Sequence, residues 1–176
     1  MAASLSKQTV LLHWLTALLF IGVLGLGLYM VDLPKSPDKF ELYGIHKSVG
    51  FIVLLIAIVR LSWRMFEGPV NSISPLPRYQ EILAKSIHHL LLLGTLLMPI
   101  SGVLMSIGGG RAVEVFGYEI VAAGDKIEWL GSISHSVHGI AADIIIVALV
   151  LHIVGALKHQ WIDKDGTVSR MLGKKV

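Results

Sequence analysis

Two histidines lie fourteen residues apart in a mostly apolar segment near the C-terminus. They are His138 and His152, and the segment spans residues 133–157. Fourteen residues of α-helix rise about 21 Å and turn through roughly 1400°, so both imidazoles point to nearly the same side. Imidazole is a standard axial ligand of haem iron. The spacing predicts two stacked haems, one near each face of a bilayer whose core is about 30 Å thick, with an electron path between them.

The composition of the chain indicates a membrane protein. Of the 176 residues, 54% are hydrophobic and 15% are charged, whereas soluble domains average about 45–50% apolar and about 25% charged residues. Cysteine is absent, which excludes disulfides, thiolate iron–sulfur clusters and covalent haem attachment through CxxCH. The net charge of +3 is explained by basic residues that flank the apolar stretches. We therefore expect the chain to sit in a lipid bilayer and to bind no nucleic acid.

Four apolar stretches are long enough to cross a bilayer, which takes about 17–25 residues. They cover about residues 9–31, 42–62, 82–107 and 131–158. Helix-breaking prolines fall in the connections between them, at Pro34, Pro37, Pro69, Pro75 and Pro77. We predict an all-α fold, in which residues 1–176 form one integral membrane four-helix bundle.

Lysine and arginine give the orientation of this bundle. One side of the membrane would carry ten of the 15 basic residues, namely Lys7, Arg60, Arg64, Arg78, Lys85, Lys158, Lys164, Arg170, Lys174 and Lys175. The other side would carry Lys35, Lys39, Lys47, Arg111 and Lys126. Because cytoplasmic segments are enriched in basic residues, both termini are expected in the cytoplasm.

Two further histidines match the first two in depth. His13 lies one turn inside the cytoplasmic end of the first stretch, level with His152. His46 lies one turn inside the outer end of the second stretch, level with His138. Depth therefore gives two pairs, and each pair can clamp one haem iron between two helices.

Other histidines compete with these four. His135 is the rival of His138, but it falls about 100° from the His152 face of the helix, while His138 falls about 40° away. His88 and His89 are level with the cytoplasmic pair and could displace one of its ligands. The favoured interpretation is that one of them faces the interior as a hydrogen-bonding or proton-transferring group and the other faces the membrane surface.

Two glycines repeat the fourteen-residue spacing. Gly27 follows His13 at this distance, and Gly102 follows His88. A helix that passes a porphyrin at the level of the other haem needs a small residue there. Small residues also let membrane helices pack closely, so this pattern has two explanations.

Three charged residues lie inside or beside the predicted helices. Arg60 follows His46 by fourteen residues and could pair with a haem propionate or extend to the lipid headgroups. Lys47 adjoins His46 and could serve a propionate or an anionic substrate, or anchor the helix at the interface. Asp143 lies well inside the fourth stretch, where we expect it to make an internal hydrogen bond.

Several short motifs contain these residues and occur in a characteristic order. They are His13-Trp14, GIHKSVG at 44–50, RLSWR at 60–64, HHL at 88–90, PISG at 99–102, His138-Gly139, HIVGALKH at 152–159 and DKDGTVSRM at 163–171. With these motifs, nearly the whole chain resembles the bacterial cytochrome b561 family of four-helix, di-haem membrane cytochromes. The connection at residues 108–130 matches no pattern of that family.

The resemblance implies cofactors, a reaction and a location. It implies two haem b groups, with His13, His46, His138 and His152 as axial iron ligands, and electron exchange with quinone in the bacterial inner membrane. The short chain without an attached domain is similar to stand-alone members that oxidise superoxide to oxygen and reduce ubiquinone, without an obligate protein partner. Superoxide is an anion, so Lys47, Arg111 and Lys126 are candidates for attracting it on the outer side.

Two other functions stay open from the sequence. A haem-bearing membrane anchor subunit could relay electrons between a partner dehydrogenase or hydrogenase and quinone. A divalent-metal carrier could also use histidines, because imidazole suits zinc and copper. Such a carrier would need histidines and carboxylates clustered near mid-membrane, whereas the histidines here form two layers near the faces.

Overall fold

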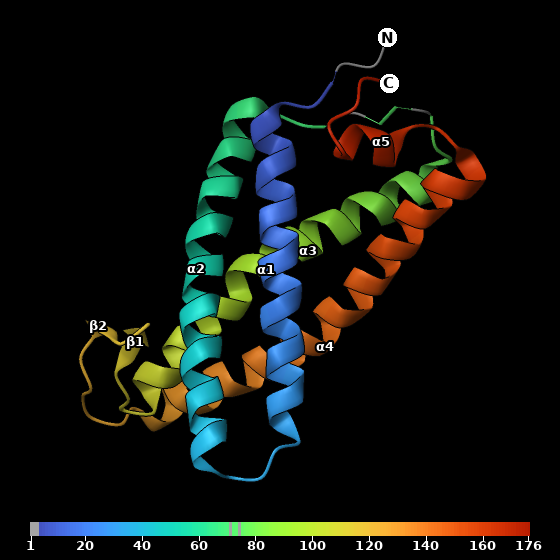
Figure 1. Cartoon of the computed structure of the whole chain (residues 1–176). Helices are drawn as coiled ribbons and strands as arrows, with labels where there is room; N and C mark the ends of the chain where they lie inside the picture. Colours follow the sequence, from blue (N-terminus) through green and yellow to red (C-terminus); the bar gives the residue numbers. More distant parts are fainter. Residues whose placement is uncertain (1–3, 71, 74) are drawn as a thin grey trace.

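Four long helices dominate the computed structural model, which describes residues 4–70, 72–73 and 75–176 (Figure 1). They are α1 (Lys7–Val31), α2 (Pro37–Glu67), α3 (Arg78–Gly108) and α4 (Glu128–Lys158). Each is long and apolar enough to cross a membrane. The predicted four-helix membrane bundle is therefore confirmed.

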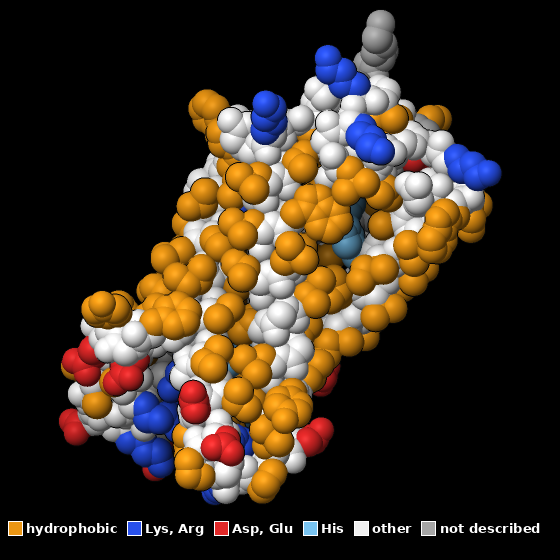
Figure 2. Space-filling model, in the orientation of Figure 1, with side chains coloured by type: hydrophobic (Ala, Val, Ile, Leu, Met, Phe, Trp, Pro, Cys, Tyr) orange, Lys and Arg blue, Asp and Glu red, His pale blue; other side chains and the backbone are white. Residues whose placement is uncertain are grey.

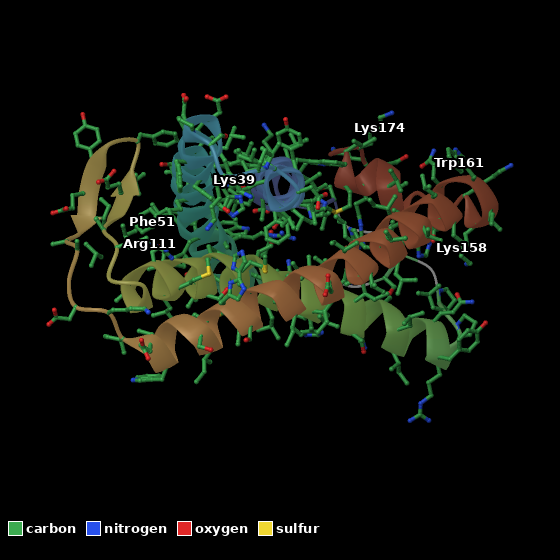
Figure 3. The ribbon with its side chains drawn as sticks, turned by 90° about the horizontal axis from the view of Figure 1, so that it is seen from below. Lys39, Phe51, Arg111, Lys158, Trp161 and Lys174 are labelled. Carbon is green, nitrogen blue, oxygen red and sulfur yellow. The ribbon has the colours of Figure 1, made fainter. Side chains whose placement is uncertain are left out.

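The helices are arranged as two inclined pairs. α1 packs against α2, α2 against α3, and α3 against α4. Seen from below, α1 and α2 appear end-on while α3 and α4 run across the view (Figure 3). Both chain termini lie at one end of the bundle (Figure 1), which we call the terminal end, and the opposite end is the hairpin end.

The helices begin and end beyond the predicted stretches because polar residues extend them. Ser36 caps α2 by accepting a hydrogen bond from the backbone N–H of Lys39. Pro37, which was expected in a connection, is the first residue of α2 instead. A proline is tolerated there because the first helical N–H groups have no intrahelical partner. α4 also starts earlier than expected, at Glu128.

A small β-hairpin occupies the connection that matched no known pattern. Its strands are β1 (Val113–Val115) and β2 (Tyr118–Val121), which pair antiparallel. The turn holds Phe116 and Gly117 at φ of 50° and 85°, a conformation that few residues other than glycine adopt. The backbone N–H of Phe116 donates to Oγ of Ser48 on α2 at 2.9 Å. The hairpin is therefore docked against the side of α2.

The terminal end is closed by two short helical segments. A π-helical turn, η1 (His159–Asp163), extends α4 and leads to α5 (Thr167–Met171). The indole N–H of Trp14 on α1 donates to the carbonyl of Met171 at 2.8 Å. This bond ties the C-terminal segment to the first helix.

A compact apolar core lies where the helices cross. Its buried side chains include Phe20, Val53, Met98 and Ile145, which come from all four helices. Large apolar side chains cover most of the outer surface between the two ends (Figure 2). This surface is the one that lipid covers in a membrane protein.

Asp143 lies on the outer surface of α4 and not in the interior. It is exposed, and its carboxyl group makes no hydrogen bond or ion pair with the other described residues. The expectation of an internal hydrogen bond was wrong, because Ala141 and Ile145 turn inward and leave Asp143 on the outer side. An aspartate at the centre of a membrane helix costs about 2.5–3.5 kcal/mol.

α3 and α4 approach each other closely at the hairpin end. A Cβ atom on Gly108 would lie 2.3 Å from the backbone nitrogen of Gly131. We predict that Gly108→Ala separates α3 from α4 and lowers the free energy of unfolding by about 1–3 kcal/mol. Denaturant titration in detergent micelles measures this. Gly155→Ala is the control, because a Cβ there meets no atom within 4 Å, and equal effects of the two changes would contradict the prediction.

Candidate functional site

Two pairs of histidines face each other inside the bundle, and α4 contributes one member to each. At the hairpin end, the ring centres of His46 and His138 are 6.4 Å apart and their planes are inclined by 72°. Towards the terminal end, the ring centres of His13 and His152 are 6.3 Å apart, with planes inclined by 56°. We call these the hairpin-side pair and the terminal-side pair.

A backbone carbonyl holds the His138 ring of the hairpin-side pair from behind. Nδ1 of His138 donates to the Met98 carbonyl on α3 at 3.0 Å, and Oγ of Ser101 lies 2.9 Å from the same nitrogen. Nδ1 of His46 is buried without an aligned hydrogen bond to the described residues, while the Val23 backbone lies beside it. A proton on Nδ1 leaves the Nε2 lone pair free to bind a metal.

Two glycines make room for these rings. A Cβ atom on Gly27 of α1 would lie 3.0 Å from Cε1 of His46, and one on Gly102 of α3 would lie 3.5 Å from Cε1 of His138. The glycines that the fourteen-residue spacing singled out therefore both border the hairpin-side pair.

The terminal-side pair has different neighbours. Nη2 of the Arg60 guanidinium on α2 lies 3.2 Å from Nδ1 of His13. The ring centre of His88 on α3 is 5.3 Å from that of His152. Arg60 also interacts electrostatically with His88 and His152. A fixed positive charge thus adjoins this pair, whereas the His138 ring is held by neutral groups.

The spacing within each pair fits one metal ion between the rings. Metal–imidazole bonds are about 2.0–2.1 Å long and a ring centre lies about 1.2 Å behind its own nitrogen, so two imidazoles on opposite sides of one metal have centres about 6.4 Å apart. Both observed distances agree with this value. Two neutral imidazoles are also a donor set that haem iron accepts.

The remaining predicted residues lie elsewhere. His135 is exposed and its Nδ1 lies 3.4 Å from Sδ of Met105, so it does not face His46. His89 is exposed, and its Nδ1 donates to the Lys85 carbonyl at 2.7 Å.

Two more residues near the helix ends have partners away from the rings. Lys47 interacts electrostatically with Arg111 and Glu114 near the hairpin. His159 contacts Asp165 at 2.7 Å. Neither residue belongs to a histidine pair.

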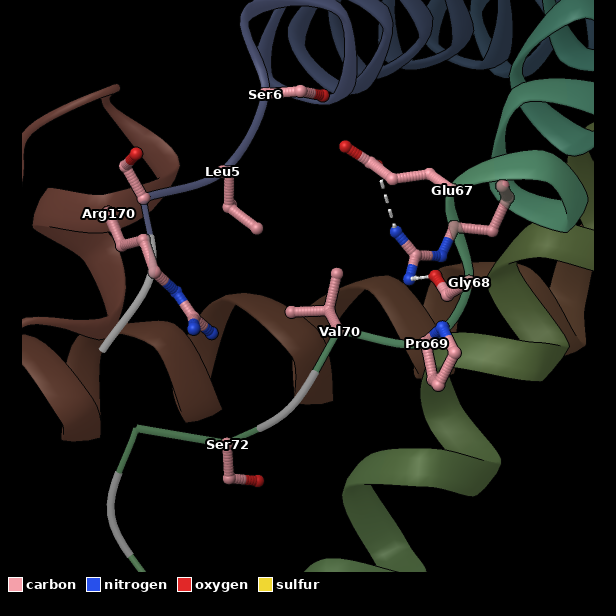
Figure 4. A pocket seen from close by; sticks show the side chains of 10 residues that line it. Leu5, Ser6, Glu67, Gly68, Pro69, Val70, Ser72 and Arg170 are labelled. Atoms are coloured by element: carbon pink, nitrogen blue, oxygen red, sulfur yellow. Dashed lines mark hydrogen bonds and ion pairs between the residues drawn. The ribbon is translucent and has the colours of Figure 1, made fainter. Parts of the chain in front are cut away.

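Three hollows lie near the two ends of the bundle. Figure 2 shows a histidine at the floor of a hollow between α1 and α4 in the terminal half. A second hollow, of about 360 Å³, lies at the hairpin end and is lined by Met105, Gly108, Gly109, Arg111, Lys126, Glu128, Gly131, Ser132 and His135. The third lies at the terminal end, where Arg64 pairs with Glu67 at 3.4 Å and Arg170 points towards them (Figure 4).

The sequence profile of the prokaryotic cytochrome b561 family matches residues 4–174. The chain belongs to this family. It is 34% identical to cytochrome b561 homolog 2 of Escherichia coli strain K12 over 92% of this chain and 87% of that protein. It is 24% identical to cytochrome b561 homolog 1 of the same strain, over 97% of each chain. It is 27% identical to the probable superoxide oxidase CybB of Yersinia pestis, over 93% of each chain.

Membership of the cytochrome b561 family confirms the coarse prediction. The chain is a multi-pass protein of the bacterial inner membrane that takes part in electron transfer, and haem b binding is a property of the family. The sequence had not indicated that Met98 and Ser101 support His138. The position of Ser101 directly before Gly102, in the PISG motif at 99–102, could have indicated that Ser101 lies near a histidine ring.

We predict that Gly27→Ala disturbs the hairpin-side pair selectively. The added methyl group would meet the His46 ring at 3.0 Å, and displacing a ligand's support weakens metal binding about tenfold or more. Haem content and low-temperature electron paramagnetic resonance of the purified protein measure this. Gly22→Ala, where a Cβ meets nothing within 4 Å, should keep the spectrum of the unsubstituted protein. A normal spectrum in the Gly27 variant would contradict the prediction.

Proposed function

We propose that this cytochrome carries electrons across the membrane from superoxide, which becomes oxygen, to ubiquinone, with two haem b groups as cofactors. The observation that carries the proposal is the pair of matched ring spacings, 6.4 Å and 6.3 Å, on two layers of one bundle. The choice of superoxide as the substrate is supported by the similarity of the chain to a probable superoxide oxidase.

In this proposal the two histidine pairs hold the two haems. His46 and His138 would ligate the outer haem, and His13 and His152 the inner haem. Haem iron, when bound, supplies one-electron redox chemistry, which the side chains of this chain lack. The fourteen residues between His138 and His152 set the two positions about 21 Å apart along α4.

Polar and charged side chains lie near both ends of the proposed electron path. Arg60 would place a fixed positive charge at the inner haem, through the His13 ring or a haem propionate. Lys47 would add positive charge near the outer haem. His88, whose ring centre is 5.3 Å from that of His152, is placed to hand over protons, because one imidazole nitrogen can accept a proton while the other donates one.

The overall reaction balances with two superoxide anions. Each loses one electron and becomes oxygen, while one ubiquinone takes up two electrons and two protons and becomes ubiquinol. The basic residues are most abundant at the terminal end, which supports placing both termini in the cytoplasm and the hairpin end outside. Superoxide would then arrive at the hairpin end.

The hollow at the hairpin end suits an anion on its way to the hairpin-side pair. Arg111 and Lys126 line it, and Glu128 offsets part of the charge through its contact with Lys126 at 3.3 Å. His135, also in the lining, is one turn of α4 from His138. We expect superoxide to approach the outer haem through this hollow.

The number of haems tests the ligand assignment. We predict two haems per chain in the unsubstituted protein and one in each of His13→Ala, His46→Ala, His138→Ala and His152→Ala, because each variant lacks one of the imidazoles that would hold a haem. Pyridine haemochrome assay and reduced-minus-oxidised spectra measure this. His89→Ala should retain both haems, since that side chain lies outside the pairs. One haem in the unsubstituted protein, or two in all four variants, would overturn the proposal.

The charge of the hollow tests the substrate. We predict that Arg111→Gln with Lys126→Gln lowers kcat/KM for superoxide about tenfold at low salt, and that the difference shrinks as salt rises. Stopped-flow reduction of a ubiquinone analogue by superoxide measures this.

Lys174→Gln, at the far end, is the control and should leave the rate unchanged. If the double variant kept full activity, superoxide would enter the protein at another place. Intact haems with no superoxide reaction at all would favour the anchor-subunit function, and co-purification with a larger redox subunit would then be expected.

A further inference from the structure

The hollow at the terminal end is lined by charged, polar and apolar side chains together (Figure 4). It has a volume of about 360 Å³ and lies between the N-terminal segment, the end of α2 with the residues that follow it, and α5. Sites that bind small molecules typically have volumes of about 300–1,000 Å³. None of the described residues that line this hollow belongs to a histidine pair, so it is separate from the candidate haem sites.

Two arginines from different elements line the hollow. Arg170 comes from α5, and its side chain points into the hollow (Figure 4). Arg64 comes from the last turn of α2. Guanidinium groups stay protonated in proteins, so both carry a fixed positive charge. Only 8% of the surface of Arg170 is exposed, and a buried charge is favourable only where other charges and hydrogen bonds compensate for the lost water.

Glu67 neutralises Arg64 only in part. Oε2 of Glu67 lies 3.4 Å from Nη1 of Arg64, whereas close ion pairs measure about 2.7–2.9 Å. The same carboxylate oxygen also accepts a hydrogen bond from Oγ1 of Thr9. Nη2 of Arg64 donates to the carbonyl of Gly68, which fixes the guanidinium at the wall of the hollow. Because a guanidinium has five N–H donors, Arg64 can hold a further acceptor.

The acid near Arg170 is shared with other groups as well. Asp165 interacts electrostatically with Arg170. Its carboxyl group also lies 2.7 Å from Nδ1 of His159 and accepts a hydrogen bond from the backbone N–H of Thr167 at 2.9 Å. Among the described lining residues of the hollow, two are basic and one, Glu67, is acidic. This excess of positive charge favours an anion as the occupant.

The level of the hollow along the bundle indicates a lipid headgroup. Arg64 is in the last turn of a helix that is long and apolar enough to span the membrane. The next two residues, Met65 and Phe66, are 78% and 84% exposed. Large apolar side chains that are this exposed at the end of a spanning helix lie against lipid, so Arg64 is at the boundary between acyl chains and headgroups. Leu5 and Val70, which also line the hollow, offer apolar surface to the glycerol part of a lipid (Figure 4).

We propose that this hollow binds the phosphate ester of an anionic phospholipid from the adjoining leaflet, with Arg64 and Arg170 as its two cationic contacts. The planar guanidinium fork matches the oxygens of a phosphate group. The hydroxyl group of Ser4, in the same lining, can donate to a further oxygen. The bound phosphate would join the N-terminal segment, α2 and α5, and so hold the C-terminal segment on the bundle.

Thermal unfolding with added lipid tests the ligand. The full chain in a neutral detergent is titrated with phosphatidylglycerol, phosphatidylcholine or diacylglycerol of the same acyl chains, and circular dichroism measures Tm. We expect phosphatidylglycerol to raise Tm to a plateau and diacylglycerol, which lacks the phosphate, to leave Tm unchanged. Phosphatidylcholine should need about tenfold more lipid for half of its effect, because the arginines repel its choline cation. Glycerol 3-phosphate, added alone, tests a soluble source of the same group.

Single substitutions test the two arginines. Arg64→Gln and Arg170→Gln should each raise the phosphatidylglycerol needed for half-maximal stabilisation about tenfold, because each removes a charge-assisted hydrogen bond. Arg78→Gln and Lys174→Gln are the controls and should stay within about twofold, since these exposed basic residues lie outside the lining. Circular dichroism without lipid shows whether each variant is folded. Arg64→Gln decides the question if the buried Arg170 cannot be replaced, because the side chain of Arg64 is 26% exposed.

Three outcomes would overturn the proposal. Equal stabilisation by phosphatidylglycerol and diacylglycerol would show that only acyl chains are recognised. Equal losses in Arg64→Gln and Arg78→Gln would show a diffuse attraction to the basic end of the bundle. Saturation by glycerol 3-phosphate at the same concentration as by phosphatidylglycerol would show that the ligand is a soluble phosphate ester and not a lipid. Neither superoxide nor quinone enters these measurements, so their result is independent of the proposed function.

Discussion

An imidazole that faces the middle of a membrane helix bundle needs a partner for each of its two nitrogens. This constraint organises the hairpin half of the molecule. The Met98 carbonyl accepts the Nδ1 proton of His138, which leaves a lone pair on Nε2. Oγ of Ser101 donates a further hydrogen bond to the same carbonyl at 2.8 Å. The close packing of α3 and α4 through Gly108 and Gly131 keeps this carbonyl within reach.

The two histidine pairs have similar ring spacings but different electrostatic surroundings. Neutral groups hold the His138 ring, while a guanidinium adjoins His13. A nearby cation favours the state of a redox centre that carries less positive charge. The structure thus contains a difference in charge along the direction in which two centres on α4 would exchange electrons.

The sequence predicted most of the fold because the signals were long and redundant. Four apolar stretches of spanning length leave little choice of architecture, and a fourteen-residue spacing on α4 places His138 and His152 on one side. The helix ends were less predictable, since Ser36 and Pro37 can either break a chain or start a helix. The hairpin was missed because Phe116 and Gly117 are not a typical turn pair and β1 has only three residues.

From the sequence, the four paired histidines of the candidate site could be predicted, but their surroundings could not. Depth along four helices pairs His13 with His152 and His46 with His138. It cannot tell that Arg60 turns inward to His13, because the same spacing also suits a residue that reaches the headgroups. The outward position of Asp143 was also out of reach. Apolar residues surround it on all sides of α4, so the helix has almost no amphipathic pattern to show which side faces the bundle.

The sharing of α4 by both pairs has a consequence for biosynthesis. His138 and His152 both lie on α4, and neither pair exists until α4 has left the ribosome and packed against the other helices. A nascent or prematurely terminated chain therefore presents isolated imidazoles and nothing that grips a porphyrin from two sides. Insertion of α4 is in this way built into the architecture as a condition for forming either histidine pair.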